Sequence, residues 1–161
     1  MNVHPLVIAD YALLEEFLYH AIFIPQGEEL PSREIIFKPE IYIYIKDYGT
    51  RKGDHGVVAE KANKIIGAAW TRIIPAYGNI DESTPELAIS MLPEHRGQGI
   101  GTSLMMALFV ELKKHGYKRT SLSVQKNNPA VRFYERLGYQ KSDESIDRVG
   151  HEDYIMVKNL M

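Results

Sequence analysis

The sequence predicts one α/β (α+β) domain built around a single sheet. Its 161 residues are close to the size of one domain, so we expect residues 1–161 to form a single unit. Hydrophobic residues make up 45% and charged residues 25%, a composition typical of a globular protein and not of a disordered or fibrous chain. Segments with strand-like and helix-like patterns follow one another in mixed order, which indicates helices packed on one sheet.

The N-terminal third is predicted to begin with a helix. Apolar residues recur at helical spacing from Asp10 to Phe23, with Asp10 as the N-cap, and the segment Pro25–Pro31 ends that helix. The stretch Ile41–Ile45 is ambiguous, because its β-branched and aromatic residues favour a strand whereas the polar turns on both sides suit a helix.

The remaining two thirds alternate between strands and helices. Two strands, Gly56–Ala62 and Ile65–Ile74, are predicted to form a hairpin around Asn63 and Lys64, and the segment Pro75–Pro85 is predicted to be a loop. The elements expected after the loop are a strand Glu86–Leu92, a helix Leu104–Lys114, a strand Thr120–Val124, a helix opened by Asn128 and Pro129 and closed by Gly138, and a strand around Arg148–Lys158.

Several classes of chemistry are excluded by residue usage. The chain has no cysteine, which removes disulfides, thiolate metal sites and a cysteine acyl-enzyme. The six histidines fall at no metal-ligand spacing, so we expect no metal, and no Gly-x-Ser-x-Gly motif is present for a serine nucleophile. The apolar runs are too short to span a membrane and the N-terminus does not resemble a secretory signal, so we expect a cytoplasmic location without membrane contact.

Positive charge is concentrated in one part of the chain. The net charge is −2, yet residues 113–141 contain eight lysines and arginines and only one acidic residue, Glu135. This stretch could be a solvated helix face, a nucleic-acid strip or a surface for a polyanionic cofactor. The pI near 6.3 and the lack of a nucleic-acid motif make the second interpretation the weakest, so we expect no nucleic-acid partner.

A glycine-rich loop joins the predicted strand Glu86–Leu92 to the helix that follows. Its core is Arg96-Gly97-Gln98-Gly99-Ile100-Gly101. Strand, glycine loop and helix form an anion-binding arrangement, because backbone N–H groups converge on phosphate oxygens near the helix N-terminus and Arg96 adds a full positive charge. The spacing fits neither the dinucleotide nor the nucleoside-triphosphate pattern, and a turn used only for packing is the alternative.

The loop resembles the acetyl-CoA loop of the GCN5-related N-acetyltransferase (GNAT) superfamily, Arg/Gln-x-x-Gly-x-Gly/Ala. Residues 127–139 are similar to the second signature of that superfamily, Asn-x-x-Ala-x-x-Phe-Tyr-x-x-x-Gly-Phe/Tyr, and the resemblance covers residues 56–140. It implies a GNAT fold, with a central mixed, mostly antiparallel sheet flanked by helices and a splayed acetyl-CoA cleft. It also implies that Ile41–Ile45 are helical rather than a strand.

The resemblance implies acetyl-CoA as co-substrate and assigns residues to it. The main chain of Met91 and Leu92 would pair with the pantetheine arm like an added strand, Asn127 would hydrogen-bond to it, and the basic stretch would lie beside the phosphates. The full set assigned to the cofactor is Met91, Leu92, Arg96, Gly97, Gln98, Gly99, Ile100, Gly101, Thr102, Asn127 and Tyr134.

Two residues are the catalytic candidates. Tyr134 matches the superfamily tyrosine that protonates the leaving CoA thiolate, although its spacing alone would also suit a buried helix face. Glu86 stands where many members carry the glutamate that deprotonates the amine. Asp81, Glu82 and His55 are alternative bases, and the acidic cluster 81–86 could instead attract a cationic amine.

The function implied is transfer of an acetyl group from acetyl-CoA to a primary amine by direct attack in a ternary complex. The acceptor would be a small-molecule amine or a peptide amine, and homodimers are common in the superfamily. Trp70 and the tyrosines are expected in the core, with the loop from Pro75 and the N-terminal helices shaping the acceptor pocket. A non-catalytic acyl-CoA-binding or regulatory module on the same fold is the alternative.

Overall fold

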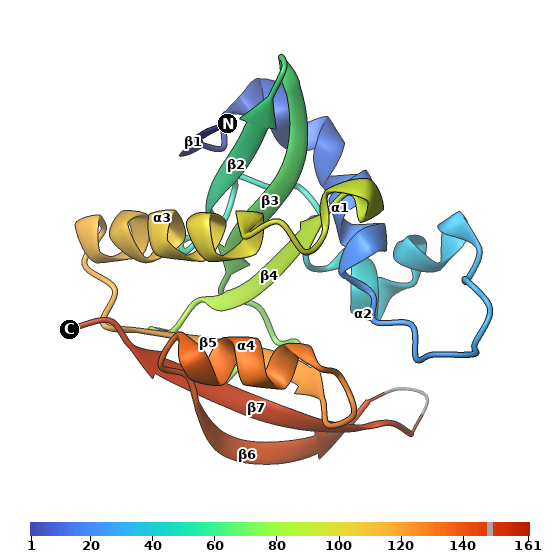
Figure 1. The fold of residues 1–161 in the computed structure, drawn as a ribbon. Coiled ribbons are helices and arrows are strands. Elements are labelled where there is room, and N and C mark those ends of the chain that lie inside the picture. Colours follow the sequence, from blue (N-terminus) through green and yellow to red (C-terminus); the bar gives the residue numbers. More distant parts are fainter. Residues whose placement is uncertain (148–149) are drawn as a thin grey trace.

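The computed structural model describes residues 1–147 and 150–161 and contains a seven-stranded sheet in the order β1-β2-β3-β4-β5-β7-β6 (Figure 1). Every neighbouring pair is antiparallel except β4 and β5, which are parallel. The strands are β1 (Asn2–Pro5), β2 (His55–Lys61), β3 (Lys64–Arg72), β4 (Glu86–Met91), β5 (Arg119–Gln125), β6 (Gln140–Ile146) and β7 (Glu152–Asn159). The predicted α/β class with a mixed, mostly antiparallel sheet is confirmed.

Helices flank this sheet. The α-helices are α1 (Leu14–Ala21), α2 (Pro39–Tyr42), α3 (Ile100–Lys114) and α4 (Ala130–Arg136), and the short 3-10 segments are η1 (Ile8–Leu13), η2 (Arg33–Phe37) and η3 (Pro93–His95). The long helix α3 lies across β2 and β3, and α4 lies along β5 (Figure 1). Leu104, Leu108 and Leu112 recur at helical spacing on α3 and are fully buried against the sheet, so this face anchors the core. None of the helices in the described part of the chain is long and apolar enough to cross a membrane.

The N-terminal helix is shorter than predicted. Asp10 lies inside η1, where its carboxylate accepts a hydrogen bond from the N–H of Val7 at 3.3 Å, and the α-helix begins only at Leu14. The backbone turns extended at Ile22, which ends α1 at Ala21.

The segment Ile41–Ile45 is helical and turn-like rather than a strand, as the resemblance implied. The N–H of Tyr44 donates to the carbonyl of Ile41 at 3.1 Å. Side chains of β3 then hold the segment: the indole N–H of Trp70 donates to the carbonyl of Tyr44, and the guanidinium of Arg72 donates to the carbonyl of Ile43. These tertiary contacts outweigh the strand propensity of the residues.

The central hairpin forms as predicted, but its turn lies one residue earlier than expected; the later predicted elements agree in type, whereas β6 was not predicted. Ala62 and Asn63 form the turn with positive φ angles of 53° and 63°. Helix α3 starts four residues earlier than expected, at Ile100, because Gly99 takes a left-handed conformation and caps it. The last predicted strand corresponds to β7, and its first expected residue, Arg148, lies outside the described residues.

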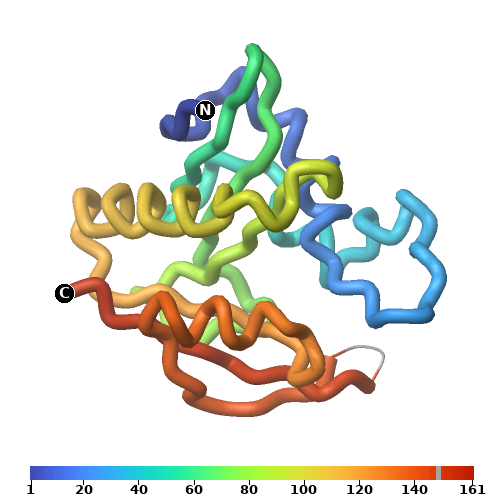
Figure 2. Tube along the Cα trace, in the orientation of Figure 1, coloured from blue at the N-terminus to red at the C-terminus, as the bar shows by residue number. Residues whose placement is uncertain are grey.

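The sheet opens between β4 and β5. These two strands share one register pair, Glu86 with Ser121. Side chains reinforce this junction, since the hydroxyl of Thr120 donates to the carbonyl of Pro85 and that of Ser121 to the carbonyl of Gly78. Past the junction the β5 side of β4 has no strand neighbour among the described residues. Figure 2 shows the N-terminal part of the chain, from blue to yellow, and the orange-to-red C-terminal part at different ends of the molecule.

Candidate active site

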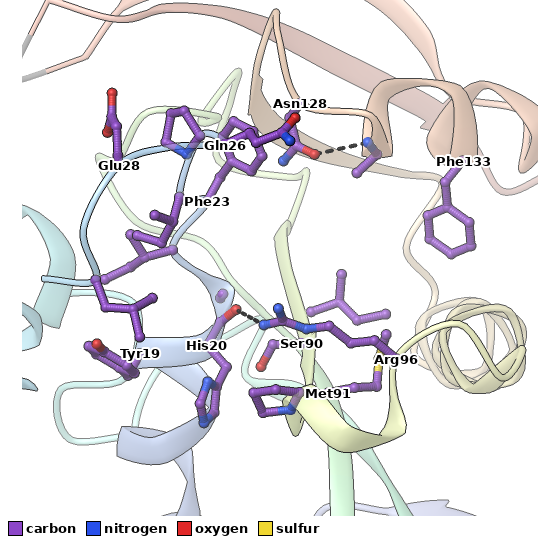
Figure 3. Close-up of a pocket in the computed structure, with 18 of the residues that line it drawn as sticks. Tyr19, His20, Phe23, Gln26, Glu28, Ser90, Met91, Arg96, Asn128 and Phe133 are labelled. Atoms are coloured by element: carbon purple, nitrogen blue, oxygen red, sulfur yellow. Dashed lines mark hydrogen bonds between the residues drawn. The ribbon is translucent and has the colours of Figure 1, made fainter.

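A cleft of about 910 Å³ lies beside the open edge of β4. Figure 3 shows its walls: Tyr19, His20 and Phe23 come from α1 and the segment that follows it, and Asn128 and Phe133 from the start of α4 and from α4 itself. The hydroxyl of Ser90 donates to the carbonyl of Phe17 at 2.6 Å, which fixes α1 against β4. We call this cavity the large cleft.

The main chain of β4 supplies unpaired groups to the large cleft. The N–H of Leu92 donates to the carbonyl of Ile66 at 2.9 Å, which sets the phase of the antiparallel ladder with β3. N–H groups alternate in direction along such a strand, so those of Ile89 and Met91 point away from β3 and toward the cleft. An extended ligand can therefore pair with β4 at these two residues.

The glycine loop turns through left-handed backbone at two positions. Gly97 and Gly99 have φ angles of 73° and 78°, which L side chains rarely adopt. A Cβ at Gly101 would lie 3.4 Å from the Cε of Met91 and 3.4 Å from the Cζ of Phe133, so glycine keeps the start of α3 close to both walls. Met91 and Phe133 both line the large cleft, so the start of α3 packs against two residues of its wall.

Arg96 lines the large cleft next to this helix N-terminus. Its Nη2 donates to the carbonyl of His20 at 3.4 Å, a long contact that leaves most of the guanidinium available (Figure 3). Gln98 and Thr102 are exposed on the same loop and first turn, whereas the side chain of Ile100 is only 4% exposed. Ile100 can therefore contribute its backbone N–H but not its side chain.

Glu86 lies in a smaller cavity of about 190 Å³, the Glu86 cavity, at the junction of β4 and β5. Its side chain is 3% exposed. The hydroxyl of Tyr44 donates to Oε2, while Oε1 is buried and lacks a well-formed hydrogen bond among the described residues. Burial raises the pKa of the Glu86 carboxyl from 4.5 to about 7, and the Tyr44 hydroxyl and the Gly78 backbone lower it by less. Glu86 is therefore poised to exchange a proton near neutral pH.

Tyr44 and Gly78 are parts of this site that the sequence did not single out. A Cβ at Gly78 would lie 2.9 Å from the Cδ of Glu86 and 2.8 Å from the carbonyl carbon of Leu122, so only glycine lets the loop close over the carboxyl. The signals for both were weak. Tyr44 is one of several tyrosines that the composition places in the core, and Gly78 is one glycine in a loop.

Tyr134 lies where the cavities meet. It lines the large cleft, the Glu86 cavity and a third cavity next to them. Its ring packs between Phe133 and Tyr139, with centroid distances of 5.4 and 5.7 Å. Burial raises the pKa of its hydroxyl to about 12, so Tyr134 keeps its proton at neutral pH and can donate it.

The alternative bases lie elsewhere. Asp81 pairs with Arg119 and accepts a hydrogen bond from the N–H of Ser83. His55 stacks on His115 with the ring centroids 4.1 Å apart. Neither residue lines the Glu86 cavity, and neither does the exposed Glu82. Of the acidic residues Asp81, Glu82 and Glu86, only Glu86 therefore lines this cavity.

The chain matches the model of the Acetyltransferase (GNAT) family over residues 21–139. It belongs to the GNAT acetyltransferase family. A mycothiol acetyltransferase from Thermobispora bispora is 33% identical over 86 residues, covering 52% of this chain and 29% of that protein. The [Ribosomal protein bS18]-alanine N-acetyltransferase from Haemophilus influenzae is 31% identical over 101 residues, covering 60% of this chain and 65% of that protein. The aligned part thus spans under a third of the first relative and just under two thirds of the second.

Solved structures agree with the GNAT fold. The structure of yncA from Salmonella typhimurium, solved with its cofactor acetyl-CoA, superposes with a TM-score of 0.71 at 20% identity and covers 100% of this chain and 94% of that chain. The ribosomal-protein-S18-alanine N-acetyltransferase from Escherichia coli gives a TM-score of 0.69 at 20% identity, covering 99% of this chain and 93% of that chain. At this identity the likeness concerns the fold.

Two expectations within the GNAT pattern need correction. Leu92 cannot offer its main chain to a ligand, because its N–H is bonded to Ile66 and its carbonyl accepts from the N–H of His95. Asn127 is exposed and faces a separate hollow, whereas Asn128 lines the large cleft. The Asn128 side chain is held there because its Oδ1 accepts the N–H of Ala130 at 2.9 Å, which caps α4 (Figure 3).

Proposed function

We propose that this GNAT family member transfers an acetyl group from acetyl-CoA to a primary amine by direct attack. The observation that carries the proposal is the meeting of three features at Tyr134: the large cleft with its glycine loop, the buried carboxyl of Glu86, and a phenol that stays protonated. We propose further that residues 1–161 act as one domain, since the sheet joins both ends of the chain.

Acetyl-CoA would lie in the large cleft. The loop 96–101 and the first turn of α3 would hold its pyrophosphate through backbone N–H groups, with Arg96 as the charged partner. Its pantetheine arm would pair with Ile89 and Met91 on the open edge of β4, next to Asn128. Bound in this way, acetyl-CoA supplies a thioester carbonyl that an amine can attack.

Glu86 would act as the general base and Tyr134 as the general acid. A lysine-like amine of pKa ~10.4 needs ~4.6 kcal/mol to lose its proton at pH 7. A base next to the amine therefore lowers the contribution of deprotonation to the activation free energy. Glu86 would first take one proton from the ammonium, and the neutral nitrogen would then attack the carbonyl carbon. As the C–S bond breaks, the second proton leaving the nitrogen would replace the one that Tyr134 gives up. The departing sulfur takes the proton of Tyr134, and the N–H of Ile89 or Met91 would stabilise the oxyanion.

The test is release of free thiol from acetyl-CoA in the presence of a panel of amines, compared with a blank without amine. Because the chain has no cysteine, the protein contributes no thiol signal. Amine-dependent release supports the proposal. Binding of acetyl-CoA without thiol release for any amine would replace it with the alternative, a non-catalytic acyl-CoA-binding module.

A further inference from the structure

A third cavity, about 340 Å³, lies next to the Glu86 cavity, and we call it the acidic cavity. It shares Tyr134, Tyr77 and Ser123 with the Glu86 cavity, so a molecule whose reactive end lies at Tyr134 can extend into it. Four carboxylates line it: Glu28, Glu29, Asp147 and Asp153. No lysine or arginine of the described residues lines it.

Asp153 supplies the acidic cavity with a buried carboxyl group. Its side chain is 4% exposed, and its Oδ1 is buried with no hydrogen-bond partner in the described part of the chain. Asp153 on β7 is paired with Gln125 on β5, and directly opposite residues place their side chains on the same face of a sheet. The Oε1 of Gln125 is buried and unpartnered in the same way. The Oδ1 of Asp153 and the Oε1 of Gln125, on neighbouring strands, can therefore both accept a hydrogen bond from an N–H donor.

The surroundings favour a donor with positive charge. Burial and the nearby Asp147 raise the pKa of the Asp153 carboxyl, His151 lowers it by less, and the resulting pKa is about 6. His151 lies with its Nδ1 3.4 Å from Asp147, and Glu28 and Glu29 add negative charge from the segment after α1. Lys126, the residue directly after β5, is paired with Glu144 and Glu152. A cationic ligand would hence offset the negative charge of Asp153, because no lysine or arginine among the described residues lines the cavity.

The sheet register sets the length of such a ligand. Glu86 is paired with Ser121 and Asp153 with Gln125, four residues further along β5. With ~3.3 Å per residue along the strand and ~4.8 Å between neighbouring strands, Glu86 and Asp153 are roughly 16 Å apart at their backbones. A ligand nitrogen hydrogen-bonded to each of these two residues would lie about 3 Å from it. Subtracting both hydrogen bonds from the separation leaves roughly 10 Å between the two nitrogens of the ligand.

From this geometry we propose that the acidic cavity is a second subsite of the acceptor, where Asp153 and Gln125 bind a cationic nitrogen about 10 Å from the reactive amine. The acceptor class is then a linear diamine or polyamine. The inference rests on the proposed function, because it takes the reactive nitrogen to lie between Glu86 and Tyr134.

Three probes test it in the thiol-release assay. Diaminooctane has two charges at about the required separation by ordinary bond lengths. Aminooctanol has the same length with one charge, and diaminopropane has two charges that cannot reach both subsites. We expect the KM for diaminooctane to be at least tenfold below the KM for either of the others. Equal KM values for diaminooctane and aminooctanol would overturn the proposal while leaving the transferase intact.

Asp153→Asn keeps the shape of the side chain and removes its charge. We expect it to raise the KM for diaminooctane about tenfold and the KM for aminooctanol by a much smaller factor, because aminooctanol has no second charge. Asp143→Asn, an exposed aspartate on β6, is the control and should change neither KM. Equal losses with both amines would show a structural role and overturn the subsite. Glu28→Gln, on an exposed segment, is a second test: it should raise the KM for diaminooctane by a smaller factor and should not raise the KM for aminooctanol.

Calorimetry separates the two proposals. If the protein releases no thiol with any amine, yet binds diaminooctane more tightly than aminooctanol and loses that difference in Asp153→Asn, the subsite stands and the proposed function fails. If it binds the two amines equally, the subsite is overturned whatever the activity.

Discussion

Replacing Glu86 with glutamine tests the assignment of the base through stability as well as through rate. Folding raises the pKa of the Glu86 carboxyl from 4.5 to about 7, which corresponds to about 3 kcal/mol. A carboxyl whose pKa is raised by folding favours the folded state while it is protonated. Its contribution is complete below about pH 4.5 and is lost as the pH rises through about 7.

The wild type should therefore lose up to about 3 kcal/mol of unfolding free energy from this group between pH 4.5 and 8. Glu86→Gln keeps the size of the side chain and cannot ionise, so it should lack that loss and exceed the wild type in stability at pH 8. Urea unfolding followed by the fluorescence of the buried Trp70 measures both curves. Other titrating groups, Asp153 among them, are present in both proteins and cancel in the difference.

Glu82→Gln is the matched control, because Glu82 is exposed on the loop before β4. This variant should change the free energy of unfolding at pH 8 by much less than Glu86→Gln does. In the activity assay, kcat/KM of the wild type should fall as the pH drops below about 7, and Glu86→Gln should have a low rate without that step. Parallel stability curves for wild type and Glu86→Gln would refute the reasoning, because they would mean that Glu86 ionises in the fold at its ordinary pKa.

Three further substitutions are predicted from contacts in the structure, the last of them a buried ion pair in which the Nε of Arg72 lies 2.9 Å from the Oδ1 of Asp54. Tyr134→Phe should lower kcat by about 10²–10⁴ and leave the Kd for acetyl-CoA, measured by calorimetry, nearly unchanged. Tyr44→Phe removes a hydrogen bond that favours the charged form of Glu86, so the midpoint of the rate-pH profile should move to higher pH by about one unit. Asp54→Asn leaves the buried Arg72 without its ion partner and should cost about 3–5 kcal/mol in urea unfolding.

Each of these has an outcome that contradicts it. A normal kcat in Tyr134→Phe would remove the acid assignment. A midpoint shifted to lower pH in Tyr44→Phe would mean that this hydroxyl favours the neutral carboxyl. An unfolding midpoint in Asp54→Asn equal to that of the wild type would mean that Arg72 finds other partners.

What the sequence could predict about this site depended on how local the signal was. The loop Arg96–Gly101 is contiguous, and its glycines take the left-handed angles that the pattern requires at Gly97 and Gly99. The hydrogen bond from Tyr44 to Glu86 joins residues 42 positions apart in the sequence, and no local pattern near either residue predicts it. Asn127 and Asn128 are adjacent and alike, so the choice between them depends on the cap of α4 rather than on composition.

The fold shows the same division. The hairpin of β2 and β3 and the helix α3 have strong periodic patterns, and both were predicted. Strand β6 has the sequence Gln-Lys-Ser-Asp-Glu-Ser-Ile and is almost wholly exposed, so it has no alternation from which to predict a strand. It is a strand because β7 offers it a ladder of backbone hydrogen bonds. Strand β1, only four residues long, likewise depends on β2.

The open side of β4 also bears on self-association. A strand with unpaired backbone groups is a template on which another chain can add a strand, and proteins protect such edges from aggregation. Here the unpaired groups of Ile89 and Met91 lie inside the sheet, between a wall from α1 and a wall from α4. A second protein strand would bring its own side chains into a recess whose walls include Phe23 and Phe133, whereas a thin extended chain brings none. The recess thus protects this edge of β4 from other strands and leaves it accessible to a thin extended ligand.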